Sequence, residues 1–247
     1  MNLIDWWINL NPLNYKEELA LLSTRNDEYT GNETDLPSNE EFFNRLPMCN
    51  LSKPYSVRVD KCATTLIQGL FDTYIDDDTL VIYTENEHYK IKEILNTFKN
   101  RLVLSYDDIL KLNMSKIASS LSKFKKVFVY IIGTQLSSGE ITPQYFFIKL
   151  KELLNTYKCH YKLVLDDVHG MYFVPRDYSL FDYIIGTTHA LIPTYHMGLL
   201  IGKENMNKFG KNGYHWIIDY FEALDVLLSR KEKIYQFNYV LEQSLAD

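Results

Sequence analysis

The chain has 247 residues, of which 46% are hydrophobic and 14% aromatic. This composition belongs to a folded protein with a sizeable core and excludes an intrinsically disordered chain. The formal net charge of -6 argues against nucleic-acid binding as the main function, because proteins that bind phosphate backbones usually carry a concentrated basic surface.

Cysteine usage and hydropathy predict the cellular setting. The three cysteines are scattered and lack metal-ligand spacing, which predicts reduced thiols, no metal site and a cytoplasmic protein. The first residues have neither the basic nor the long apolar region of a signal peptide, and no apolar run approaches the roughly 18 residues of a membrane span. We therefore expect no membrane segment.

Differences in composition and hydrophobic pattern divide the chain into three parts. Residues 1–50 are rich in Asn, Glu, Pro and Thr and predict an N-terminal arm. Residues 51–212 alternate apolar runs with helical patterns and predict one large domain. Residues 213–247 are helical in pattern and carry no recognisable chemistry.

Within the large domain, apolar runs rich in β-branched and aromatic residues alternate with amphipathic segments. In chain order the pattern predicts strands at 79–84, 102–105, 127–132, 162–166, 183–186 and 198–201. It predicts helices at 63–74, 89–99, 107–123 and 143–157. Apolar strands separated by helices predict a three-layer α/β/α fold with a mostly parallel sheet. Ligands of such sheets bind at the carboxyl ends of the strands.

Polar residues at the start of the first predicted helix form the first candidate site. Thr64 and Thr65 follow Cys62 and Ala63 there. Backbone amides at a helix N-terminus, with a threonine hydroxyl, suit a phosphate dianion. A threonine-rich helix cap without a ligand explains the same residues equally well.

A second candidate site lies where two later strands end. Asp166 closes the 162–166 strand, His169 follows three residues on, and Thr187, Thr188 and His189 come about twenty residues later. A carboxylate at the end of a parallel strand can face a ligand. The alternatives are that Asp166 or its neighbour caps the following turn, and that the second segment is a plain polar turn.

Taken together and in order, residues 56–203 resemble the fold type I pyridoxal-phosphate-dependent enzymes, the aspartate aminotransferase superfamily. Asp-x-x-His-Gly at 166–170 and Ile-x-Gly-Thr at 184–187 are similar to α-oxoamine synthases, and Asp-x-x-His also to serine hydroxymethyltransferase. Glu-His at 87–88 is similar to cysteine desulfurases and class V aminotransferases. The resemblance implies pyridoxal phosphate (PLP) as cofactor, an amino acid or amine as substrate, and a homodimer with its site at the interface. It also implies that the C-terminal small domain of the family is largely absent.

The resemblance also implies a role for each candidate residue. Asp166 would pair with the ring nitrogen of the cofactor, His169 would lie near the ring, and His88, or Tyr89 in its place, would stack on it. Gln135 would stand in for an asparagine, because the position of that asparagine holds Leu136. Residues implied to contact the phosphate or its loop are Ala63, Thr64, Thr65, Thr187 and His189, with Cys62 replacing the glycine of the family.

The family's Schiff-base lysine is missing, because the turn ends in Ala190. That lysine anchors the cofactor and moves protons on the substrate, so catalysis through Ala190, Asp166 and His169 is expected to be slow or absent. Arg176 and the N-terminal arm are the candidates for substrate contact.

Four hypotheses remain open. The chain is an inactivated variant in which alanine replaces a native lysine; or it is a natural noncatalytic subunit that completes the site of a longer, lysine-bearing partner. Alternatively, it is a lysine-independent enzyme that uses PLP or pyridoxamine phosphate (PMP) with His189 or His169 as base. A nucleotide-binding α/β domain with magnesium held by Asp166 and Asp167 is the alternative outside this family, disfavoured because no glycine-rich phosphate-binding motif occurs. The reaction, transferase or lyase, is left open.

Overall fold

The computed structural model describes residues 55–60, 62–135, 138–171, 174, 176–187, 198–203 and 206–209. The predicted arm, 1–50, and the predicted C-terminal segment, 213–247, lie outside the described residues, so the domain limits stay a prediction. No helix formed by the described residues is long and apolar enough to cross a membrane.

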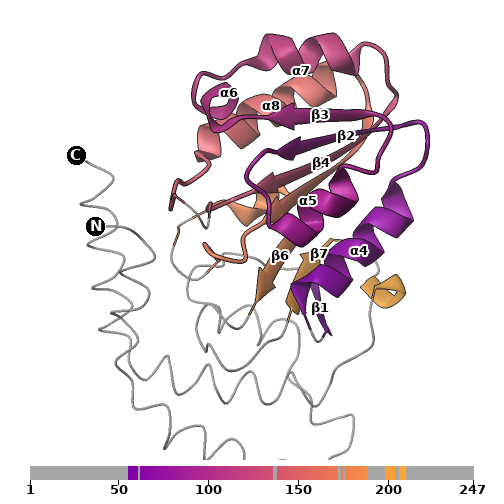
Figure 1. Ribbon diagram of the computed structural model, residues 1–247, viewed down its shortest axis with the longest axis vertical. Coiled ribbons are helices and arrows are strands. Elements are labelled where there is room, and N and C mark those ends of the chain that lie inside the picture. The colour runs from indigo at the N-terminus through magenta and orange to yellow at the C-terminus, as the bar shows by residue number, and fades with distance from the viewer. Residues whose placement is uncertain are drawn as a thin grey trace, which may run out of the picture.

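The described residues form one seven-stranded sheet, which confirms the predicted fold class (Figure 1). Its strands are β1 (Ser56–Asp60), β2 (Thr79–Thr84), β3 (Arg101–Leu104), β4 (Lys126–Ile132), β5 (His160–Asp166), β6 (Tyr183–Thr187) and β7 (Gly198–Gly202). They are ordered β1-β7-β6-β5-β4-β2-β3. Neighbours from β3 to β6 are parallel, whereas β7 is antiparallel to both β6 and β1. The carboxyl ends of β2, β4, β5 and β6 therefore meet at one edge.

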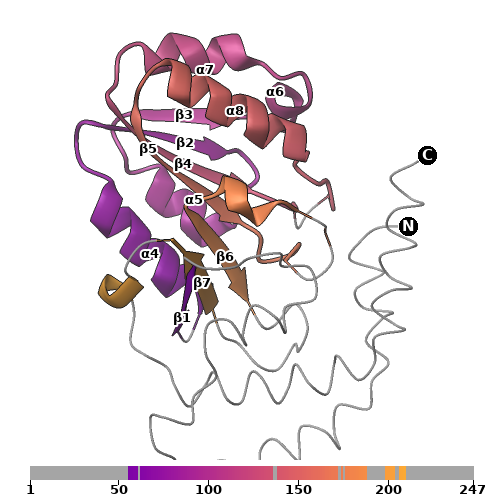
Figure 2. The same cartoon turned by 180° about the vertical axis from the view of Figure 1, so that it is seen from behind.

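Helices cover both faces of this sheet, as Figures 1 and 2 show from opposite sides. One face carries α4 (Ala63–Tyr74) and α5 (Tyr89–Leu95), and the other carries α6 (Tyr106–Leu110), α7 (Met114–Leu121) and α8 (Gln144–Thr156). Short 3-10 turns, η2 (Tyr178–Leu180) and η3 (Met206–Lys208), complete the described elements.

Alternation along the strands divides the core into two apolar layers, because successive side chains of a strand point to opposite faces. Ile82 and Val129 pack in the layer under α6, α7 and α8. Tyr83 and Tyr130 pack in the layer under α4 and α5, where the ring of Phe71 meets Tyr130 edge to face at 5.5 Å. The strands are buried along nearly their whole length, and this explains why their sequences read as continuous apolar runs.

Most predicted elements are confirmed, and two differences have local causes. The predicted helix at 107–123 is wrong: it is divided into α6 and α7, because Leu112 adopts a positive φ of 49°, which no α-helix accommodates. A capping box formed by Ser105 and Asp108 begins α6. The helix predicted at 89–99 ends earlier, at Leu95. Strand β1 was not predicted.

Gly198 brings the start of β7 against the start of α4. A Cβ atom at Gly198 would lie 2.3 Å from the backbone nitrogen of Ala63, far inside van der Waals contact. We predict that Gly198→Ala lowers the free energy of unfolding by about 1–3 kcal/mol, because strand and helix must separate. Gly69→Ala, within α4, should instead raise it by about 0.5–1 kcal/mol, since its Cβ would make an ordinary 3.7 Å contact with Phe209. Urea unfolding of both variants checks this, and equal effects would contradict it.

Candidate functional site

Asp166 lies where the sequence predicts it, at the carboxyl end of β5. It pairs in register with Ile132 of β4 and Ile185 of β6. Because successive side chains of a strand alternate between its two faces, Asp166 lies on the same face as Val164. That face is the one covered by α4 and α5. Asp166 is only 6% exposed, so it is a buried carboxylate in the middle of the edge formed by the carboxyl ends of the parallel strands.

Two donors from the protein hold the Asp166 carboxylate. The hydroxyl of Tyr130 donates a hydrogen bond to Oδ2, and the backbone N–H of Val168 donates to Oδ1 at 3.2 Å. Burial raises the pKa of Asp166 above its usual value, and the hydrogen bond from Tyr130 opposes that rise. A carboxylate has about four acceptor positions, so Asp166 can also accept a hydrogen bond from a bound ligand.

Of the two adjacent aspartates, Asp167 is the one that has a structural role in the turn after β5. The fully buried Asp167 accepts a 2.6 Å hydrogen bond from the hydroxyl of Tyr178, and its Oδ1 lies 3.3 Å from Nε of Arg176. Arg176 also donates to the carbonyl oxygens of Gly133 at 2.6 Å and Thr142 at 2.9 Å. Arg176 therefore joins the turns that follow β4 and β5, and its contact with substrate stays a prediction.

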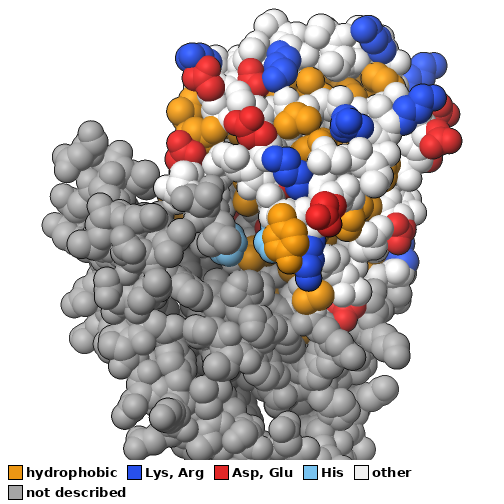
Figure 3. Space-filling view, in the orientation of Figure 1, with side chains coloured by type: hydrophobic (Ala, Val, Ile, Leu, Met, Phe, Trp, Pro, Cys, Tyr) orange, Lys and Arg blue, Asp and Glu red, His pale blue; other side chains and the backbone are white. Residues whose placement is uncertain are grey.

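The turn after β2 places His88 beside Asp166. His88 is exposed and precedes the first residue of α5, and its ring centroid lies 4.6 Å from that of Tyr89. His88 is close enough to Asp166 to lower the pKa of that carboxyl, and close enough to His169 to lower the pKa of that imidazole. Figure 3 shows histidine and hydrophobic side chains together on this face. The structure thus brings these three predicted site residues together.

Gln135 connects the turns after β2 and β4. Its side chain is 2% exposed, and Oε1 accepts hydrogen bonds from Nδ2 of Asn86 at 2.7 Å and from the hydroxyl of Ser138 at 3.3 Å. The position of Leu136, where the family has asparagine, lies outside the described residues. The contact that the structure gives Gln135 is therefore with the neighbouring turn that carries His88.

His169 is held as a neutral imidazole. Burial, and after it the charge of His88, lower the pKa of His169 from 6.5 to about 4. Between these values the unfolded chain binds a proton that the folded chain excludes, so this residue removes stability as the pH falls from 6.5 towards 4.

We predict that His169→Gln reduces the loss of stability between pH 7 and pH 4.5. His160→Gln, at an exposed histidine at the start of β5, should leave the loss as it is in the unmodified chain. Urea unfolding at both pH values measures the difference between the variants. A His169→Gln profile parallel to the unmodified one would rule out this role.

Those predicted phosphate residues that the structure describes lie around the start of α4 and Gly198. Cys62, the N-cap residue of α4, makes no side-chain cap hydrogen bond, although its Sγ forms a 3.2 Å hydrogen bond with Oγ1 of Thr65, and the first turn of α4 has no acidic residue. Thr187, at the end of β6, pairs in register with Gly198, which in turn lies against Cys62 and Ala63. An uncapped helix start beside a strand end is a suitable anion site. Thr64 and Thr65 lie in this first turn, whereas Thr188, His189 and Ala190 lie outside the described residues.

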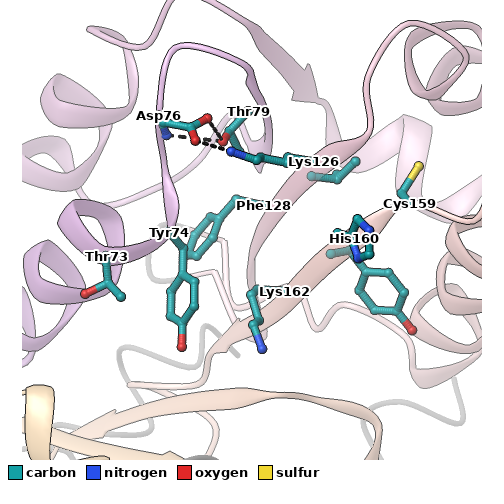
Figure 4. A pocket seen from close by; sticks show the side chains of 11 residues that line it. Thr73, Tyr74, Asp76, Thr79, Lys126, Phe128, Cys159, His160 and Lys162 are labelled. Atoms are coloured by element: carbon teal, nitrogen blue, oxygen red, sulfur yellow. Dashed lines mark hydrogen bonds and ion pairs between the residues drawn. The ribbon is translucent and has the colours of Figure 1, made fainter.

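A pocket of about 510 Å³ lies at the other end of the sheet. Asp76 and Lys126 form an ion pair on one side of it, and Lys162 points into it beside the ring of Tyr74 (Figure 4). These residues lie near the amino ends of β2, β4 and β5. The pocket is therefore separate from the Asp166 edge.

Comparison with known proteins adds evidence on the fold. No protein-family model and no curated protein matches this sequence. A NifS-like protein from Rickettsia africae, 15% identical, superposes with a TM-score of 0.59 over 76% of this chain and 55% of its own. The PLP-bound C-S lyase from Staphylococcus hominis, 11% identical, has a TM-score of 0.64 over 91% and 64%.

A third similar structure is a kynurenine aminotransferase from Pyrococcus horikoshii in complex with PMP. It is 14% identical, and its TM-score is 0.62 over 91% of this chain and 62% of its own. The chain thus spans 55–64% of the length of these structures.

The residues of the Asp166 edge fit the group that two of these proteins hold. A buried carboxylate suits a protonated ring nitrogen, an uncapped helix start suits a phosphate, and exposed His88 suits a ring face. With its mostly parallel seven-stranded sheet and these likenesses, the chain has the fold of the fold type I pyridoxal-phosphate-dependent enzymes.

Proposed function

We propose that the chain binds pyridoxal phosphate at the carboxyl ends of its parallel strands. The observation that carries the proposal is Asp166, a 6% exposed carboxylate at the end of β5 with acceptor positions left for a ligand. When bound, the cofactor supplies a ring that accepts electrons from an amino acid or amine substrate. Asp166 holds a proton on the ring nitrogen, and Tyr130 fixes the position of that carboxylate.

The remaining residues orient the ligand. The first turn of α4, with Ala63, Thr64 and Thr65, offers its amides and hydroxyls to the phosphate, together with Thr187 and His189. His88 covers one ring face, and Gln135 orients the turn of His88 through Asn86. His169, neutral at physiological pH, lies beside them without adding charge.

Catalysis by this chain is impaired, because Ala190 supplies no amine for a covalent link and no base. We infer an inactivated form of a PLP-dependent transferase or lyase that still holds cofactor and substrate. A cytoplasmic homodimer with the site at the interface is part of this proposal. A natural noncatalytic subunit beside a longer, lysine-bearing partner accounts for the same residues, including the departures at Cys62 and Leu136.

A lysine-independent enzyme is the other alternative. It needs His189 or His169 as its base, and the pKa of His169 distinguishes between these two histidines. The pKa of His169 is about 4, and a group with so low a pKa is a weak base at neutral pH. This alternative therefore depends on His189, and it predicts that substitution of His189 abolishes turnover without releasing the cofactor.

Binding of PMP tests the proposed function, because PMP has no aldehyde that could react with surface lysines. Asp166→Asn should weaken PMP binding about 30-fold, the equivalent of roughly 2 kcal/mol, while the amide still accepts from Tyr130. Asp77→Asn, the same change at an exposed position at the other end of the sheet, should bind like the unmodified chain. Isothermal titration calorimetry measures all three. No binding by the unmodified chain would overturn the proposal.

A further inference from the structure

Glu87 is a buried acid that the site described so far does not use. It lies in the turn between β2 and α5, one residue before His88, and is 6% exposed. Its Oε1 accepts a hydrogen bond from the hydroxyl of Thr84, whereas Oε2 is buried with no hydrogen-bond partner. A buried polar atom without a hydrogen-bond partner lowers the stability of a protein by about 1–3 kcal/mol. Its presence in the folded chain therefore requires an explanation.

Glu87 and the Asp166 carboxylate have neighbouring residues in common. Thr84, which holds Glu87, also accepts a 3.4 Å hydrogen bond from the backbone N–H of Ile132, the residue that pairs with Asp166. Tyr130, which donates to Asp166, lies near enough to Glu87 for both carboxyl groups to raise the pKa of its phenol. Two acids thus share one buried space at the ends of β2, β4 and β5.

Two carboxylates in one buried space do not both carry charge, because repulsion adds to the loss of hydration. Asp166 has the better partners for a charge, namely the Tyr130 hydroxyl and the Val168 amide. Glu87 has the Thr84 hydroxyl at Oε1 and the nearby backbone amides of Thr84 and Ile132, but its Oε2 has no hydrogen-bond partner. The proton of the pair therefore resides on Glu87, and its Oε2 becomes a hydroxyl able to donate a hydrogen bond.

We propose that Glu87 belongs to the cofactor site as a neutral acid, which presents its Oε2 hydroxyl to a polar atom of the bound ring compound and leaves Asp166 as the single anion. This inference rests on the proposed cofactor binding and extends it by one residue. Glu87 is a positioning and binding residue in this scheme, and no proton needs to leave it during binding.

Among the described residues, the balance of electrostatic effects favours a neutral Glu87. Burial, and after it the charge of Asp166 on β5, raise the pKa of Glu87 well above its ordinary value, whereas the Thr84 hydroxyl and the backbone amides of Thr84 and Ile132 oppose this rise. The other titratable groups of the described part of the chain that face Glu87 are Tyr83 of β2 and Tyr130 of β4. His88 faces Asp166. Because the folded chain keeps a proton that the unfolded chain releases, Glu87 reduces stability as the pH rises from about 4.5 through its raised pKa.

The test compares Glu87→Gln, a neutral isostere that retains a donor, with Glu87→Leu, which removes it, and with Glu85→Gln. Glu85 is an exposed carboxylate of the same turn and serves as the matched control. PMP affinity is measured by calorimetry at pH 6 and pH 9. We expect Glu87→Gln to bind like the unmodified chain at pH 6, and more tightly than it once the pH exceeds the raised pKa of Glu87. Glu87→Leu should bind about tenfold more weakly at pH 6. Glu85→Gln should follow the unmodified chain at both pH values.

The outcomes separate the two proposals. If the unmodified chain binds PMP but Glu87→Gln has the same pH profile, or Glu87→Leu binds normally, the role of Glu87 is overturned and cofactor binding stands. If the unmodified chain does not bind PMP, both proposals fail. Carbon-13 NMR of the Glu87 carboxyl in the unmodified chain provides a measurement that needs no variant to fold. Titration of Glu87 in the ordinary range of a glutamate would overturn the inference, and titration well above it would support it.

Discussion

Replacement of Arg176 by methionine should lower the free energy of unfolding by about 3–5 kcal/mol, because a buried ion pair that loses one partner leaves an uncompensated charge. Asp167 is fully buried and would keep only its hydrogen bond from Tyr178. The carbonyl oxygens of Gly133 and Thr142 would lose donors as well. Urea unfolding measures the change.

A surface ion pair offers the matched control. Lys149 and Glu152 are joined at 2.7 Å with side chains that are 53% and 58% exposed, so Lys149→Met should change stability by less than about 1 kcal/mol. Adding Asp167→Asn to Arg176→Met should recover part of the loss, since it removes the stranded charge. An Arg176→Met variant as stable as the control would contradict the structural role given to Arg176.

Introduction of lysine at Ala190 should produce the largest gain in activity. A lysine there provides an amine for a covalent link to PLP and a base for the substrate α-proton, and general base catalysis contributes about 10²–10⁴-fold. We expect Ala190→Lys to raise the rate of α-hydrogen exchange of its amino acid substrate in deuterium oxide by about that factor. NMR with a panel of amino acids and amines measures the exchange, and the responding compound identifies the substrate class.

Leu191→Lys is the control for that experiment, because it adds the same side chain one residue further along. Borohydride reduction followed by peptide mass spectrometry should find the cofactor on the new lysine of Ala190→Lys, in preference to surface lysines. Labelling and exchange that are equal in the two variants would show that position 190 is not the place of a Schiff-base lysine. Those results would favour the noncatalytic-subunit alternative.

The local sequence pattern was sufficient to predict the strand that ends in Asp166. The apolar run at 163–165, which is followed by Asp166, could be recognised as part of a buried strand because both faces of the sheet are covered, and the structure places the carboxylate as expected. The break at Leu112 was missed, because apolar periodicity continues across it and only the backbone conformation reveals it.

The sequence could not reveal the roles of residues that are buried by segments distant in the chain. From the sequence Arg176 was a candidate for substrate contact, whereas its structural role depends on carbonyl groups 34 and 43 positions earlier in the chain. Glu87 was passed over for the neighbouring His88, because its burial depends on β4 and β5, which follow much later. Such roles arise from contacts between distant segments, to which a local pattern is insensitive.

The pairing of β1 with β7 has a consequence for how the chain acquires its structure during synthesis. Ser56 lies opposite Gly202, and Asp60 lies opposite Gly198, so the first strand to leave the ribosome waits for the last strand of the sheet. At about 5–20 residues per second, the intervening stretch of about 140 residues takes roughly 7–30 s to translate. Until then both edges of β1 lack a partner, instead of one edge as in the completed sheet, and a chaperone that shields residues 56–60 would protect the nascent chain from aggregation.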